Sequence, residues 1–284
     1  MTSLSHLLRK TERRFAICGI GDARIEADLV WMTTLEVDRA ELYARMDDSP
    51  SEVEAESAEA LIQRRLRHEP TAYLLGHREF YNIDLLVGVG ALIPRPDTEA
   101  LVEEALRVAV DLPAPITIAD VGCGTGAIGL TIAANLPSAH VYATDLYPAS
   151  LDLARRNTER LGLAERVDVL EGDLLTPLPG PVDMITSNLP YVESGEIPTL
   201  DPEIRMYEPR EALDGGKDGL DLIRRFLVDV PRYLNPLGVV LMEMDPRQIA
   251  RASAFAAEAV PGANIRIVQD LTRRDRVLVI EMPA

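Results

Sequence analysis

The sequence predicts an α/β fold in which a small helical domain precedes a seven-stranded, mostly parallel sheet with helices on both faces. Three observations support this fold class. Residues 1 to about 75 carry apolar side chains at helical spacing, strand-like and helix-like stretches alternate from residue 116 onward, and a glycine-rich turn follows the first of those strands. The 284 residues suffice for two domains, which we expect at 1–78 and 94–284, with a β-hairpin or linker at 79–93 between them.

The first domain is predicted to be entirely helical. A second apolar set extends from Asp28 to Tyr43, and Ser51 followed by Glu54 predicts a capping box for a helix that continues until Pro70 stops it. The first helix is indicated by apolar residues at helical spacing: Leu4, Leu7, Leu8 and Phe15. Acidic residues between 47 and 59 are interpreted as a solvated face, with a docking surface for a basic partner as the alternative.

The segment 79–93 has short strand-like spacing and glycines at 88 and 90. Two prolines, Pro94 and Pro96, keep the next residues out of a helix until one begins near Asp97 or Thr98. From residue 116 we expect strands at 116–121, 140–145, 167–171, 182–187, 238–244, 264–269 and 276–282, and helices beginning near 126, 148, 217 and 246. The loop Leu271–Asp275 is too short for a crossover helix, so the last strand is predicted to run antiparallel.

The composition excludes several classes of function. A formal net charge of -17 argues against sequence-independent nucleic-acid binding, which depends on Lys and Arg. The two cysteines, Cys18 and Cys123, give neither a disulfide framework nor metal spacing, and the four histidines are scattered. No signal peptide or membrane span is visible. We therefore expect a cytoplasmic monomer with no metal, no membrane association and no direct nucleic-acid partner.

The glycine turn is the first candidate binding site. Gly122, Cys123, Gly124, Thr125 and Gly126 follow the first predicted strand and lead into a helix, whose N-terminal N–H groups can face an anion. The anion could be the carboxylate of a methionine-type cofactor, but the spacing also fits the dinucleotide fingerprint. A tight turn without any ligand is the third alternative.

Three residues at the next strand ends extend this site. Asp145 closes the second strand, where a carboxylate can accept hydrogen bonds from ribose hydroxyls; the alternative role is a helix cap. Asp173 and Leu174 close the third strand, where Asp173 can accept from an adenine amino group and Leu174 can pack on the ring. A plain turn is a nearly equal interpretation of these two residues.

The turn Asn188-Leu189-Pro190-Tyr191 follows the fourth strand. It distinguishes between a methionine-type cofactor and a dinucleotide cofactor. An enzyme that transfers a hydride with a nicotinamide cofactor needs an acid or a base near the reacting atoms. No side chain in this turn titrates near neutrality. The Asn188 side-chain oxygen and the Leu189 carbonyl can each accept one N–H of a planar NH2 group, and Tyr191 can lie against a flat amide or base. We therefore predict methyl transfer from S-adenosyl-L-methionine to such a nitrogen, achieved by positioning rather than by base catalysis.

These motifs resemble the protein-(glutamine-N5) methyltransferases that modify peptide chain release factors, the HemK or PrmC family. The resemblance covers nearly the whole chain: Glu69 to Gly76 with Phe80, Ile93 to Glu99 with Leu101 to Glu103, the glycine turn, Asn188 to Tyr191, and Tyr207 to Arg210 with Ala212, Leu213 and Gly216. One departure is Leu189, where the family usually has proline; a residue before proline still favours extended backbone angles, so its carbonyl should keep its direction.

The resemblance implies a Rossmann-like class I S-adenosyl-L-methionine-dependent methyltransferase. Its substrate would be the glutamine of the Gly-Gly-Gln loop of release factors, which the N-terminal helical domain helps to hold. Asn188 and Leu189 would grip the glutamine amide, and Gly122 to Gly126, Asp145, residue 174 and Asn188 would surround the cofactor.

Other roles stay open at this point. Arg95, Asp97, Thr98 and Glu99 could shape the pocket or only begin a helix, and Glu208 with Arg210 has the same ambiguity. A DNA adenine-N6 methyltransferase would use the same kind of turn, and a ribosomal-protein glutamine methyltransferase would use identical chemistry. A cofactor-binding protein without catalysis is the alternative from another class, with Leu189 as the trace of the loss.

Overall fold

The computed structural model describes residues 2–283 and divides into two compact units. One unit is the chain up to Gly76 together with Asp201–Tyr207, and the other is His77–Leu200 together with the chain from Glu208 onward. The expected division into 1–78, 79–93 and 94–284 therefore differs from these units in its first boundary and in the later segment that joins the helical unit.

The helical unit contains α1 (Leu4–Ile17), α2 (Ala23–Leu35), α3 (Arg39–Ala44), α4 (Glu52–Leu66), α5 (Thr71–Leu75) and α9 (Pro202–Tyr207). Its core consists of apolar side chains from the first four helices, among them Leu8, Phe15, Trp31, Leu42 and Ile62. The predicted capping box at the start of α4 is confirmed, with the Ser51 side chain accepting from the backbone of Glu54.

Two features of this unit were not specified by the sequence. The apolar stretch 28–43 falls on two helices, because Glu36 adopts a left-handed conformation with φ 52° and separates α2 from α3. The helix α9 was not predicted, because its six residues bury no side chain and so lack an apolar stripe. It is instead held by an ion pair from Glu203 to the buried Arg65, 2.5 Å long, and by the Tyr207 hydroxyl on the Arg67 carbonyl.

The second unit begins with an antiparallel hairpin of β1 (His77–Phe80) and β2 (Ile83–Leu86). A hairpin was one of the two alternatives predicted for this part of the chain, the other being a linker. Its two-residue turn, Tyr81 and Asn82, has positive φ at both positions, which matches the twist of the flanking strands.

The main sheet has seven strands in the order β5-β4-β3-β6-β7-β9-β8. Their bounds are β3 (Ile116–Val121), β4 (Ala139–Asp145), β5 (Val167–Glu171), β6 (Val182–Ser187), β7 (Leu234–Glu243), β8 (Asn264–Gln269) and β9 (Asp275–Glu281). The strand β9 pairs antiparallel with both β7 and β8, which confirms the prediction for the last strand. The chain winds from β3 to β5 in one direction and from β6 onward in the other, so the switch point lies between the neighbouring strands β3 and β6.

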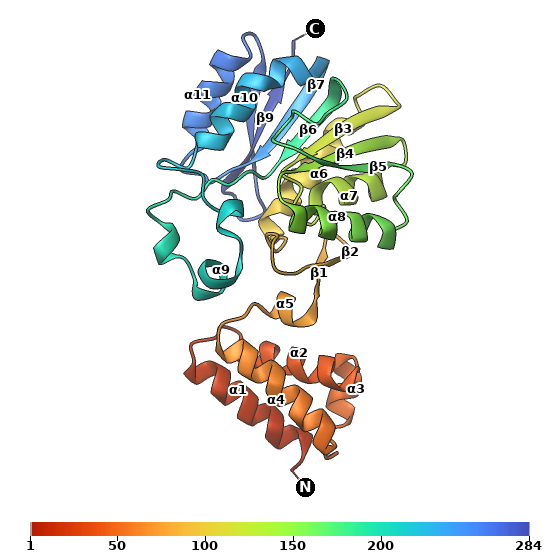
Figure 1. The fold of residues 1–284 in the computed structure, drawn as a ribbon, viewed down its shortest axis with the longest axis vertical. Helices are drawn as coiled ribbons and strands as arrows, with labels where there is room; N and C mark the ends of the chain where they lie inside the picture. The colour runs from red at the N-terminus through yellow and green to blue at the C-terminus, as the bar shows by residue number, and fades with distance from the viewer. Residues whose placement is uncertain (1, 284) are drawn as a thin grey trace. The chain divides into compact units, whose positions relative to one another are not determined.

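Helices cover both faces of this sheet, and each face has its own apolar core (Figure 1). On one face lie α6 (Glu99–Ala109), α7 (Ala127–Asn135) and α8 (Pro148–Arg160), and on the other lie α10 (Asp221–Tyr233) and α11 (Ile249–Ala259). Short 3-10 turns occur at η1 (Pro96–Thr98), η2 (Ile197–Thr199) and η3 (Arg210–Ala212).

Two predicted boundaries are wrong by about four residues. The helix α10 begins at Asp221 rather than near 217, because Gly219 has a left-handed φ of 72° that a helix cannot continue through. The strand β7 begins at Leu234 rather than 238, and its pairing with β6 shifts register between Val182 and Met184. The shift lets a strand that contains Pro236 remain in the sheet.

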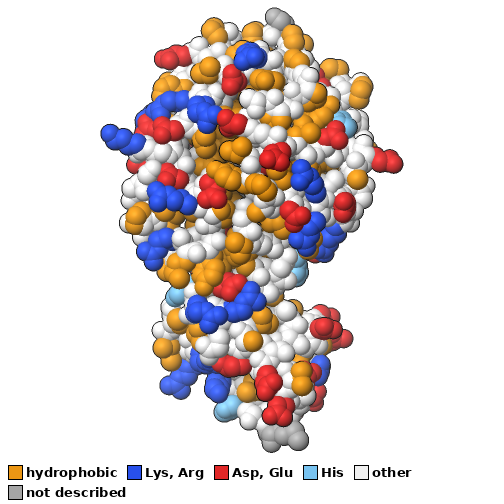
Figure 2. Space-filling model, viewed as in Figure 1, with side chains coloured by type: hydrophobic (Ala, Val, Ile, Leu, Met, Phe, Trp, Pro, Cys, Tyr) orange, Lys and Arg blue, Asp and Glu red, His pale blue; other side chains and the backbone are white. Residues whose placement is uncertain are grey.

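None of the helices within residues 2–283 is long and apolar enough to cross a membrane. On the face drawn in Figure 2, acidic and basic side chains are interspersed, with hydrophobic side chains between them. On this face the acidic excess of the sequence does not form one continuous patch.

Candidate active site

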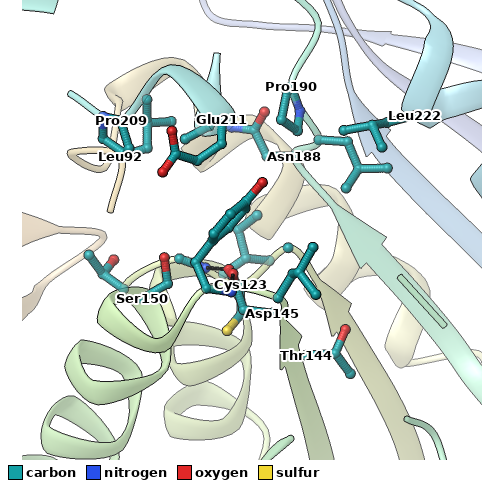
Figure 3. A pocket seen from close by; sticks show the side chains of 18 of the residues that line it. Leu92, Cys123, Thr144, Asp145, Ser150, Asn188, Pro190, Pro209, Glu211 and Leu222 are labelled. Carbon is teal, nitrogen blue, oxygen red and sulfur yellow. Dashed lines mark hydrogen bonds between the residues drawn. The ribbon is translucent and has the colours of Figure 1, made fainter. Parts of the chain in front are cut away.

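A cavity of about 270 Å³ lies at the carboxyl ends of β3, β4, β5 and β6, where the strand order reverses. In Figure 3 the residues Cys123, Thr144 and Asp145 lie on one side of it, and Asn188, Pro190, Pro209 and Glu211 on the other. The predicted site residues that line it are Gly122, Cys123, Gly124, Thr125, Asp145, Asp173, Leu174, Asn188, Leu189 and Pro190. The predicted residues Gly126 and Tyr191 do not line it.

The glycine turn folds tightly because three of its residues have left-handed backbone angles. Gly122, Gly124 and Gly126 have φ of 71°, 56° and 83°, a region that other residues enter only with strain. The N–H groups of Gly122 and Cys123 both bond to the Thr144 carbonyl, which ties the turn to β4. Gly126 is the residue before α7 and does not line the cavity. A Cβ at this position would collide with the Leu130 side chain.

Asp120, the acid before the glycine turn, supports the turn from below. Its carboxylate is fully buried and accepts from the Gly129 N–H at 2.9 Å and from the Thr186 hydroxyl at 3.2 Å. One of the free N–H groups in the first turn of α7 is therefore already satisfied. Burial raises the pKa of Asp120 to about 7. Burial also raises the pKa of the Cys123 thiol, which disfavours the reactive thiolate form.

Asp145 lies at the end of β4 with its side chain at the cavity wall. One carboxylate oxygen accepts from the Gly124 N–H at 2.9 Å and the other from the Tyr147 N–H at 3.0 Å. Burial raises its pKa, against these two hydrogen bonds. Each oxygen keeps a further lone pair, so the carboxylate can still accept from two hydroxyl groups of a ligand.

The end of β5 forms the next part of the wall. Asp173 makes an ion pair with Arg225 of α10, and both residues line the cavity. Leu174 has a left-handed φ of 52°, unusual for leucine, and its carbonyl accepts from the Thr144 hydroxyl at 3.0 Å. The hydrogen bond from Thr144 thus holds Leu174 next to β4 in this strained conformation. The Asp173 carboxylate already has a cationic partner in Arg225.

The turn after β6 brings an amide and a buried apolar side chain to the cavity. The Asn188 side-chain nitrogen donates to the Thr98 hydroxyl at 3.3 Å, which leaves the Asn188 side-chain oxygen as an acceptor. Leu189, where the family usually has proline, is 4% exposed and packs in the apolar core beside Gly122. Its side chain therefore fixes the turn through packing rather than through a ring.

Tyr191 points away from the cavity. Its hydroxyl donates to the buried Glu243 carboxylate at 3.2 Å, and its carbonyl accepts from the Gln248 side chain at 2.8 Å. Burial is the main cause that raises the pKa of Tyr191. The ring is thus part of the protein core behind the turn rather than part of the cavity lining.

The segment before α6 contributes to the site through Arg95 and Thr98. Both line the cavity, and Thr98 makes no side-chain cap for α6, so shaping the pocket is the role that the geometry supports for these two. Arg95 forms an ion pair with the buried Glu208, which also accepts from the Ile93 N–H at 3.2 Å. This pairing holds the residues after Glu208, including Pro209 and Glu211, against the cavity.

The other ambiguous residues lie outside the lining. Asp97 pairs with Arg276 at 2.8 Å, Glu99 accepts from the Tyr81 N–H at 3.2 Å, and Arg210 pairs with Asp214 at 2.8 Å on the surface. Within the described residues no group of three or more His, Cys, Asp or Glu could hold a metal.

The prediction missed several residues of the site. Some lining residues are apolar or small and gave no sequence signal: Leu92, Tyr147, Ser150, Ala212 and Leu222. Two charged residues were also missed: Arg225 in the lining and Glu243 behind it. Arg225 lies on a helix and Glu243 on a strand, and neither is part of a recognisable sequence motif. Glu243 could have been found as a charged residue at the end of an otherwise apolar strand.

The order of the sheet and the cavity at its switch point define an α/β methyltransferase, and residues 98–203 match the family model described as the methyltransferase small domain. Residues 6–76 match the model described as the PrmC N-terminal domain. The chain belongs to the release factor glutamine methyltransferase family, which confirms the resemblance drawn from the motifs.

Two relatives illustrate this membership. The release factor glutamine methyltransferase of Moorella thermoacetica is 38% identical over 275 residues, which cover 96% of each chain. That of Geobacter sulfurreducens is 41% identical over 227 residues, which cover 80% of this chain and 78% of its own. A crystal structure of a methyltransferase from Pyrococcus furiosus, 16% identical, shares the fold with a TM-score of 0.54 and covers 81% of this chain and 99% of its own.

Proposed function

We propose that this chain transfers a methyl group from S-adenosyl-L-methionine to the side-chain amide nitrogen, N5, of the glutamine in the Gly-Gly-Gln motif of peptide chain release factors. The observation that carries the proposal is the orientation of Asn188. Its nitrogen is engaged by Thr98, so its oxygen is the free acceptor at the wall of a cavity that also contains Asp145 and the glycine turn.

The residues of the cavity fit the cofactor. The Asp145 carboxylate, 8% exposed, retains lone pairs for two ribose hydroxyls. At Gly124 an added Cβ would meet no atom within 4 Å, so the turn leaves open space beside its backbone. Leu174 offers an apolar surface and Asp173 a carboxylate to the adenine, although Arg225 competes for that carboxylate.

When bound, the cofactor supplies an electrophilic methyl group on a positively charged sulfur. An amide nitrogen is a poor nucleophile, because its lone pair is delocalised into the carbonyl. The Asn188 side-chain oxygen and the Leu189 carbonyl would each accept one N–H of the glutamine amide and direct the nitrogen toward the methyl group. The N–C bond forms as the S–C bond breaks, and the methylated nitrogen then loses a proton to water.

We infer that the helical unit contacts the release factor. Residues 6–76 match a family model of their own, which supports a role shared by the family rather than a role in the cofactor site. We infer activity in the cytoplasm, because a release factor as substrate supports that location.

The proposal is tested by incubating the chain with methyl-labelled S-adenosyl-L-methionine and a release factor. Label should appear on the wild-type factor and be absent from a factor with Ala in place of the motif glutamine. Duplex DNA at low salt and ribosomal proteins serve as competing substrates. Label on either of these instead, or cofactor binding without any transfer, would contradict the proposal.

A further inference from the structure

A buried carboxylate lies directly behind the Asn188 turn. Glu243 ends β7, is 2% exposed, and carries no part of the proposed chemistry. It accepts from the Tyr191 hydroxyl at 3.2 Å, and one of its oxygens, Oε2, makes no well-aligned hydrogen bond within residues 2–283. A charged group in such a place is costly unless it is paired, so its position calls for a role.

Thr98 connects this carboxylate to the cavity. Its hydroxyl accepts from the Asn188 side-chain nitrogen at 3.3 Å and also interacts with the Glu243 carboxylate. Burial raises the pKa of Glu243, and the negative charge of Asp97 adds to this rise. The contact with Thr98 and the positive charge of Arg276 oppose it and favour the ionised form. Three residues from η1, β7 and the turn after β6 thus form one chain of polar contacts, with a hydrogen bond between Asn188 and Thr98 and an electrostatic contact between Thr98 and Glu243.

The direction of these hydrogen bonds follows from an ionised Glu243, the form that Arg276 and the Thr98 and Tyr191 hydroxyls favour. A hydroxyl has one hydrogen, and an ionised carboxylate can only accept. With the Thr98 hydrogen directed at Glu243, only a lone pair of the hydroxyl faces Asn188, which must then present its NH2 group rather than its oxygen. Without that constraint the amide could turn over and present an NH2 group to the substrate NH2 group, two donors that cannot pair.

Resting on the proposed function, we propose that Thr98 and Glu243 are positioning residues that hold the Asn188 amide with its oxygen toward the substrate nitrogen. The same carboxylate anchors Tyr191, so it fixes both ends of the Asn188–Tyr191 turn. Neither residue touches the reacting atoms in this role, and both act through Asn188.

Steady-state kinetics of the full chain with a release factor test the proposal. Thr98→Val keeps the shape without the hydroxyl, and Glu243→Gln adds an NH2 donor that competes for the Thr98 lone pair. Each is expected to lower kcat about tenfold, with the cofactor Kd nearly unchanged, because misorientation of a positioning group affects the rate more than binding. Thr98→Ser should recover most of the rate lost in Thr98→Val.

Two further measurements separate positioning from general damage. The double variant Thr98→Val/Glu243→Gln should be no slower than the slower single variant, since both act through one chain. Thr158→Val serves as the matched control, because Thr158 is also buried and, among the described residues, its hydroxyl donates only to the Ala154 carbonyl of its own helix. Multiplied losses in the double variant, or equal losses in Thr98→Ser and Thr98→Val, would overturn the proposal.

The side-chain NH2 signals of Asn188 in NMR spectra give a readout that needs no activity. They should shift and exchange faster in Thr98→Val and Glu243→Gln than in the wild type. If the wild type methylates no release factor but these signals change as expected, the proposed substrate is wrong and the positioning chain stands. If the wild type is active and the signals do not change, the positioning chain is wrong.

Discussion

Asp145 accepts a hydrogen bond from the Gly124 N–H, 2.9 Å away, and so joins the end of β4 to the turn that follows β3. The second carboxylate oxygen accepts from Tyr147 at the start of α8. One side chain therefore sets the spacing between two strand ends and still offers lone pairs to the cavity. Asp145 therefore contributes both to local structure and to the cavity wall.

Asp145→Ala should weaken S-adenosyl-L-methionine binding by about 10- to 100-fold, because the ribose hydroxyls lose two charge-assisted hydrogen bonds of about 1.5 to 3 kcal/mol each, partly offset by water. Asp145→Asn, which keeps one acceptor, should lie between Ala and wild type. Isothermal titration calorimetry measures both. The exposed Asp152→Ala is the control and should bind normally; an Asp145→Ala variant with wild-type affinity would remove Asp145 from the cofactor site.

Gly90→Ala should destabilise the protein by about 1 to 3 kcal/mol, because Gly90 has φ 108° and an added Cβ would collide with the Cβ of Ala149. Gly88→Ala, two residues earlier in the same loop, meets no atom within 4 Å and should be neutral. Urea unfolding monitored by circular dichroism gives both values. Equal effects of the two substitutions would show that the close approach at Gly90 is not limiting.

Asp120→Asn should change how stability depends on pH. The pKa of Asp120 is raised from 3.8 to about 7 in the folded protein, so the folded state binds more protons than the unfolded state between these values. Its contribution to stability is therefore full below pH 4 and is lost as the pH rises through 7, with a slope of up to about 1.4 kcal/mol per pH unit.

Asparagine mimics the protonated acid and can keep both partners, the Gly129 N–H and the Thr186 hydroxyl. Between pH 5 and pH 8 the free energy of unfolding of Asp120→Asn should therefore rise by about 2.5 kcal/mol relative to the wild type. Denaturant titrations at the two pH values measure this difference. A constant difference across this range would mean that Asp120 stays ionised.

Arg65→Ala should cost the helical unit about 3 to 5 kcal/mol, because Arg65 is 2% exposed and pairs with Glu26 at 2.8 Å and Glu203 at 2.5 Å. Its neighbour Arg64 makes a partly exposed pair with Glu69, so Arg64→Ala should cost no more than about 1 kcal/mol. Thermal unfolding compares the two. Limited proteolysis should also cut near α9 faster in Arg65→Ala, and unchanged cleavage would indicate that other contacts hold α9.

The sequence was informative where local chemistry decides the structure. The buried, mostly apolar run Ile116–Val121 and the alternating run Val167–Glu171 predicted strands with their observed bounds, and the short loop before the last strand required its reversal. The glycine turn, Asp145 and Asn188 were predictable because backbone conformation and position at a strand end restrict which residues occur there.

Other features depend on contacts between distant parts of the chain. Tyr191 was expected beside the substrate, but nothing in the turn itself shows that Glu243, 52 positions later, binds its hydroxyl instead. From the sequence, Thr98 was equally suited to capping a helix or to shaping the pocket. Only its hydrogen bond with Asn188 and the absence of a side-chain cap favour the pocket role. The partner of Asp173 was hidden for the same reason, because Arg225 lies on a helix that the strand order brings back to this edge.

Because Asp201–Tyr207 belongs to the helical unit, the chain passes between the two units three times rather than once. A fragment that begins after Gly76 would therefore still contain part of the helical unit, residues 201–207. The remaining protein would keep α9 but lose Arg65, leaving Glu203 without the guanidinium that neutralises it. Separate expression of the second unit therefore also requires a short polar linker in place of residues 201–207.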